Sequence, residues 1–177
     1  IALQILDIKD FMQKLLIGAA FDPFWLSEAS VTTSITYNLT GSLQPEFFDT
    51  EEKEALALEG RNYALWKDVK PSAFPFMKGK KTPLHFKIVF LLSRKNVEKL
   101  LQDHPLGLTT EDIFGLFVNF QYDGTHLTCT TGTSLKTFTL DKTLDHVWDD
   151  LIPKNSSNNR RFPIKIYSLQ KKCEVYI

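Results

Sequence analysis

The stretch from residue 116 to residue 140 constrains the fold most strongly, because it has the pattern of short strands joined by tight turns. Residues 116–122 and 126–131 have strand character, and Asp123-Gly124 between them fits the two positive-φ positions of a type I′ hairpin turn. Gly132 predicts a second turn and residues 134–140 a third strand. Strands joined by such short turns pair antiparallel, so we expect an antiparallel sheet.

Helices are predicted between the strands, and their starts are the best-marked features. Asp7 fits the cap of a helix whose apolar residues at 8, 11, 12, 15 and 16 share one face. Asp49 opens a second helix that Gly60 ends, and Ser93 and Asp141 fit the starts of two more. The pattern predicts an α+β fold: a largely antiparallel sheet with three or four helices, several of them packed on one face.

Three further segments complete the expected layout. Residues 84–92 are apolar on both faces and are expected to form a central strand. Residues 24–39 are expected to form one long alternating strand, and residues 71–81, with two prolines and a glycine, an irregular segment. The order strand, helix, strand, strand then occurs at 1–40 and at 84–131, which suggests an internal duplication. Such a β-α-β-β repeat would be similar in topology to one subunit of the sliding-clamp fold.

A change in charge divides the chain. Residues 154–177 carry six basic side chains against Glu174, a net charge of +5, whereas residues 1–153 carry −5 and the whole chain is neutral. We therefore expect one α+β domain over 1–153 and a basic tail over 154–177. Two cysteines without a C-x-x-C pair favour a reducing compartment, and no apolar run is long enough for a membrane span. The expected location is the cytoplasm.

The basic segment 67–81 is the main candidate for an interaction site. Its candidate residues are Lys67, Lys70, Phe74, Lys78, Lys80 and Lys81. Lysines interleaved with aromatic rings suit a phosphate backbone and stacked bases. The alternative is an ordinary solvated loop whose phenylalanines fill the core.

The sequence contains no recognisable catalytic motif. Gly79-Lys80-Lys81-Thr82 lacks the spacing of a phosphate-binding loop, and Asp123-Gly124 fits a turn better than phosphotransfer chemistry. His146, Asp149 and Asp150 could share one helix face, but they are too few for an ordinary metal site. Threonines crowd residues 125–139, where they indicate either sheet propensity or a flat recognition surface. No catalytic, cofactor-binding or metal-binding residue is assigned.

Several segments resemble an uncharacterised bacterial family, one of the domains of unknown function. The segments are 6–12, 21–22, 26–29, 65–69, 78–83 and, most strongly, 127–142. The resemblance covers roughly residues 1–150, and it implies no activity and transfers no site residue.

Three functions remain open at this point. The leading prediction is a non-enzymatic cytoplasmic interaction module that binds another macromolecule, most plausibly a protein. The second is nucleic-acid binding through the loop 67–81 and the basic tail, which would depend steeply on salt. The third is an enzyme of unrecognised type that uses Glu28, His126 or Cys129, and it would require a polar pocket around them.

Overall fold

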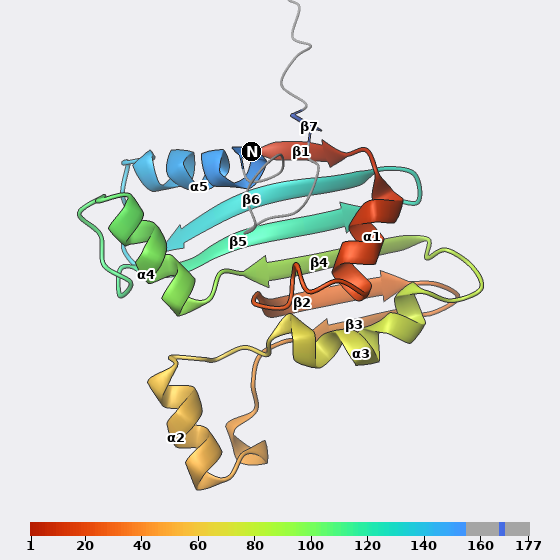
Figure 1. Cartoon of the computed structure of the whole chain (residues 1–177), viewed down its shortest axis with the longest axis horizontal. Helices are drawn as coiled ribbons and strands as arrows, with labels where there is room; N and C mark the ends of the chain where they lie inside the picture. Colours follow the sequence, from red (N-terminus) through yellow and green to blue (C-terminus); the bar gives the residue numbers. More distant parts are fainter. Residues whose placement is uncertain (155–166, 169–177) are drawn as a thin grey trace, which may run out of the picture.

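One antiparallel sheet forms the centre of the molecule (Figure 1), whose computed structural model describes residues 1–154 and 167–168. The strands lie in the order β3-β2-β4-β5-β6-β1-β7, and every pairing is antiparallel. The strands are β1 (Ala2–Ile5), β2 (Trp25–Thr32), β3 (Thr36–Thr40), β4 (His85–Leu91), β5 (Ile113–Tyr122), β6 (Leu127–Leu135) and β7 (Tyr167–Ser168).

Five α-helices and one short 3₁₀ helix accompany the sheet in the described residues. They are α1 (Ile8–Leu16), η1 (Pro45–Phe47), α2 (Thr50–Leu58), α3 (Trp66–Met77), α4 (Arg94–Asp103) and α5 (Thr143–Lys154). The α+β fold with an antiparallel sheet is confirmed, but the expected number of helices, three or four, is wrong. Apart from Lys154 and the two residues of β7, the predicted basic tail lies outside the described residues.

Two of the helix starts follow their sequence signals, whereas Ser93 stands at the start of α4 without a side-chain capping bond. The Asp7 side chain accepts a hydrogen bond from the Asp10 backbone N–H at 2.8 Å, which caps α1. Asp49 and Glu52 form a reciprocal capping box at α2, and Gly60 lies just beyond that helix with a φ of 58°. The central position of β4, between β2 and β5, is also as predicted.

The predicted strand boundaries are partly wrong. Residues 24–39 form a hairpin of β2 and β3, closed by the Thr33 N–H donating to the Ile35 carbonyl at 2.8 Å. Gly132 makes no turn, because it pairs with Phe117 inside the continuous strand β6. Within Asp123-Gly124, only Gly124 has a positive φ, so the turn is not type I′. The Asp123 carboxylate instead accepts hydrogen bonds from the backbone N–H groups of Thr125 and His126.

The largest correction is α3, which replaces most of the irregular segment expected over 71–81. Pro71 and Pro75 lie inside this helix, although proline removes a backbone donor there. The helix buries Trp66, Ala73 and Met77 against the core. Burial of that face outweighs the proline cost, since helices in proteins owe most of their stability to tertiary packing.

The internal duplication is not confirmed. The element order β-α-β-β does occur twice, as β1-α1-β2-β3 and as β4-α4-β5-β6. The strand pairing differs, because β4 pairs with β5 in the second unit, whereas β1 pairs with β6 and not with β2 in the first. The similarity to a sliding-clamp subunit remains a prediction.

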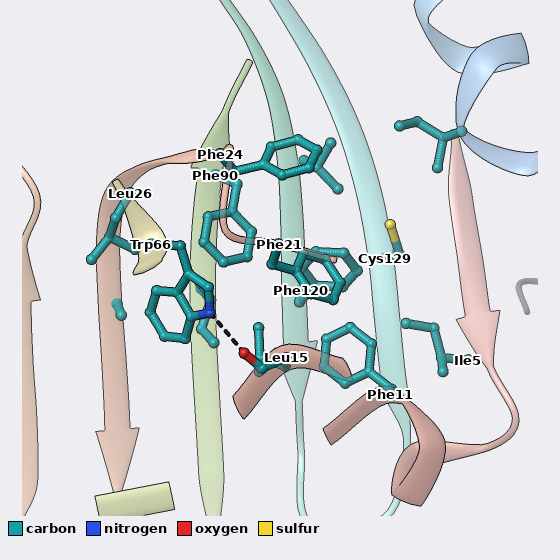
Figure 2. Packing of buried hydrophobic residues seen from close by; sticks show 14 of the residues in the cluster. Ile5, Phe11, Leu15, Phe21, Phe24, Leu26, Trp66, Phe90, Phe120 and Cys129 are labelled. Atoms are coloured by element: carbon teal, nitrogen blue, oxygen red, sulfur yellow. Dashed lines mark hydrogen bonds between the residues drawn. The ribbon is translucent and has the colours of Figure 1, made fainter. Parts of the chain in front are cut away.

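A cluster of aromatic rings on one face of the sheet forms the core (Figure 2). Phe90 and Phe120, on neighbouring strands, lie 5.6 Å and 5.5 Å from the ring of Phe21. Phe11 of α1 packs 4.8 Å from Phe120, and Trp66 of α3 packs edge-on at 5.3 Å from Phe90. The rings therefore hold both helices on the same sheet face.

One buried hydrogen bond connects these two helices. The Trp66 indole N–H donates to the Leu15 carbonyl at 2.8 Å (Figure 2). The carbonyls of the last helical turn have no partner within their own helix, so the indole satisfies one that would otherwise be buried and unpaired.

We expect Trp66→Phe to lower the free energy of unfolding by at least about 2 kcal/mol, because it leaves the Leu15 carbonyl unpaired and shrinks a buried ring. Trp25→Phe is the matched control, since Trp25 is half-buried and stacks on Tyr63, and it should cost less than about 1 kcal/mol. Urea unfolding followed by circular dichroism measures both. Equal losses would contradict a special role for the Trp66 hydrogen bond.

Candidate binding groove

A groove of about 630 Å³ lies between α1 and the segment that follows α3. We call it the α1–α3 groove. Its first wall is a stripe of α1 made by Ile8, Met12 and Leu16, which are four residues apart and therefore share one helix face. Ile17, just after the helix, extends this wall and is 59% exposed. This wall is thus mostly apolar, with Ile8 and Met12 half-buried, Leu16 buried and Ile17 exposed.

The second wall runs from Met77 to Pro83, and the floor consists of two stacked rings. Phe86 of β4 and Tyr122 of β5 are neighbours across the sheet, with ring centroids 5.2 Å apart and nearly parallel planes. The Tyr122 hydroxyl donates to the Gly124 carbonyl at 2.7 Å, which holds its ring in place. Met12 and Met77, the two methionines of the chain, face the groove from opposite walls.

The groove is positively charged. Lys9, Lys78, Lys80 and Lys81 line it, and no carboxylate is among its described lining residues. The Lys78 ammonium lies 5.3 Å from the centre of the Phe74 ring, a cation–π contact. A site with an apolar floor and a basic rim suits a ligand that combines apolar groups with negative charge.

The structure brings together only some of the predicted site residues. Lys78, Lys80 and Lys81 line the α1–α3 groove. Phe74 does not line it, but its ring contacts the Lys78 ammonium. Lys67 lies at the opposite end of α3, where it lines another hollow between α2 and α4. Lys70 donates to the Asp22 carboxylate at 2.5 Å and to the Gly18 carbonyl at 2.9 Å, so it ties α3 to the end of α1. The segment 67–81 is therefore not one continuous basic loop.

Sequence reasoning missed the α1 side and the floor of the groove. One signal was present in the sequence: methionine is frequent at adaptable binding surfaces, and this chain has only two. Their positions, 12 and 77, gave no indication that they would face each other.

Comparison with known protein families identifies the chain. A family model described as a family of unknown function, DUF5721, matches residues 14–160. The chain belongs to this family. The comparison with curated proteins and that with solved structures found no match.

The predicted resemblance to a family of unknown function is thereby confirmed for this DUF5721 chain, while its bacterial origin stays a prediction. In the described part of the chain, no helix is long and apolar enough to cross a membrane.

The three residues named for an enzyme do not meet. Glu28 pairs with Lys87 at 2.7 Å on one face of the sheet, whereas Cys129 is fully buried on the other. His126 lies exposed in the β5–β6 turn, 3.6 Å from Asp123. Among the described residues, no group of three His, Cys, Asp or Glu side chains is placed to hold a metal ion.

The threonines of β6 divide between the two sheet faces. Thr131 and Thr133 lie on the side of Cys129 and donate hydrogen bonds to Asp149 and Asp145 of α5. Thr130, on the opposite side, accepts a hydrogen bond from the Asn119 amide at 3.2 Å. Part of the threonine pattern therefore anchors a helix and does not form one recognition surface.

We expect the Cys129 thiol to be inert in the folded protein, because burial raises its pKa to about 12. In a Cys173→Ser variant, where Cys129 is the remaining cysteine, its reaction with Ellman's reagent near pH 8 should be about three orders of magnitude slower than that of a free thiol. The rate should become ordinary in guanidinium chloride. Fast reaction in the folded state would restore Cys129 as a candidate nucleophile.

Proposed function

We propose that this protein is a non-enzymatic binding module whose α1–α3 groove takes a protein segment with apolar and acidic side chains. The observation that carries the proposal is the composition of the groove. Two methionines and a stacked Phe86–Tyr122 floor offer apolar contact, and the described residues around them include four lysines and no carboxylate.

The shape of the site favours a protein segment as the ligand. An amphipathic helix binds by laying its apolar face into a groove of this kind. Flexible methionine side chains repack around such a face, and lysines at the rim steer an acidic partner during association. The volume of about 630 Å³ admits a few apolar side chains.

The aromatic residues near the groove suit stacked nucleic-acid bases less well. Single-stranded nucleic acid requires open ring faces for its bases. Phe76 is half-buried and stacked on Tyr37 at 4.0 Å, and Phe74 is half-buried beneath Lys78. Lys70 is held by Asp22, which removes a further cation from the predicted surface.

The proposal also includes the domain bounds and the cellular location of the protein. We take residues 1–153 as one domain, which the core supports because its buried members run from Leu3 to Ile152. We place the protein in the cytoplasm, which fits the free, buried thiol of Cys129.

The test begins with a peptide-display library selected against the full chain, and selected peptides should combine apolar residues at helical spacing with Asp or Glu. Binding is then followed by NMR of ¹³C-methyl methionine, since both methyl signals of the chain report on the groove. Lys80→Glu with Lys81→Glu should weaken binding about tenfold, because each exposed ion pair contributes up to about 1 kcal/mol.

Lys95→Glu with Lys99→Glu is the matched control, because these exposed lysines of α4 lie outside the groove lining. It changes the net charge equally and should leave the affinity unchanged. Selected peptides that leave both methionine signals in place, or that bind both variants equally, would contradict the proposal.

A further inference from the structure

A second feature of the surface is complementary to the groove. Residues 42–60, which we call the acidic arm, leave the sheet after β3 and return just before α3, and they carry η1 and α2 (Figure 1). Six carboxylates against Lys53 give the acidic arm a net charge of −5. Neither of its helices has a buried residue.

The acidic arm also exposes large apolar side chains. Phe47 is 86% exposed and Leu58 is 90% exposed, among the most exposed of the large apolar residues described. A nine-residue helix without a buried residue is marginal alone, because helices depend on packing for most of their stability. The capping box at Asp49 forms the start of α2, yet Leu58 at its other end stays exposed and only Leu56 is half-buried.

The acidic arm is thus an apolar and acidic segment of the type that the groove is suited to bind. It cannot reach the groove of its own chain in the described arrangement. The arm joins the Trp66 end of α3, whereas the groove begins at Met77, and twelve helical residues separate these ends by roughly 18 Å. Figure 1 shows α2 projecting away from the body on the side opposite α1.

We propose that the acidic arm of a second copy of this chain occupies the α1–α3 groove. This rests on the proposed function, and it names the partner segment. Lys9, Lys78, Lys80 and Lys81 of one copy then face the carboxylates of α2 in the other, while Phe47 or Leu58 enters between the two methionines. Reciprocal docking buries both arms in a closed dimer.

A charge-exchange experiment tests the proposal with two full-length variants. The groove variant carries Lys80→Glu and Lys81→Glu, and the arm variant carries Glu51→Lys and Glu54→Lys. Each should self-associate about tenfold more weakly than the natural chain in sedimentation velocity, because the two reversals remove four unit charges from one side of each contact, from four lysine charges to none in the groove or from −5 to −1 in the arm. An equal mixture should recover association, since the mixed dimer keeps one natural contact and, in the other, places the new glutamates of the groove opposite the new lysines of the arm.

Lys99→Glu with Lys142→Glu controls for net charge, because both lysines are exposed and line neither the groove nor the hollow beside α2, and circular dichroism confirms that every variant is folded. In the natural chain, a synthetic peptide of residues 45–59 should shift both methionine methyl signals and dissociate the dimer. The proposal would be overturned if the natural chain stays monomeric at every concentration. It would also be overturned if neither pair of charge reversals changes the affinity of the dimer. If library peptides bind the groove and the arm peptide does not, this inference fails while the proposed function stands.

Discussion

The hydrogen bond from the Trp66 indole to the Leu15 carbonyl sets the relation between the two helices on which the groove depends. It joins the first residue of α3 to the last turn of α1 inside an aromatic core. Lys70 adds a second connection at the same place through Asp22 and Gly18. With α1 and α3 fixed in this way, the Ile8–Leu16 stripe of α1 faces the segment that follows α3 across the floor of Phe86 and Tyr122.

Much of the fold follows from local chemistry that the sequence displays. The side chains of Asp7 and Asp49 cap their helices by accepting hydrogen bonds from backbone N–H groups three residues later, and residues 85–91 are apolar enough to be central. α3 was missed because its two prolines weaken the local helix signal, while the compensating burial of Trp66 and Met77 comes from residues distant in sequence. Gly132 was misread as a turn because an isolated glycine indicates a turn or bulge locally, whereas its pairing with Phe117 inside β6 depends on the neighbouring strand β5.

The candidate site was harder to predict than the fold, because more of it depends on residues that are distant in sequence. Lys78, Lys80 and Lys81 were identified because they are adjacent in sequence. The pairing of Lys70 was not visible in the sequence, since its partner Asp22 lies 48 positions away and nothing local marks the pair. The floor and the α1 wall were missed because their residues meet only when β4 pairs with β5 and α1 packs on the sheet.

The neutral net charge of the chain is a poor guide to its surface. The acidic arm carries −5, and four lysines gather at the groove about one helix length away. At physiological salt, dissolved ions screen the interaction between exposed charges that are more than about 8 Å apart. The arm therefore does not cancel the positive potential at the groove of its own chain. Two opposite fields therefore persist on one neutral molecule. The attraction between arm and groove is strongest when a second molecule brings them within a few ångströms of each other. The same contact excludes water from the apolar residues that both expose.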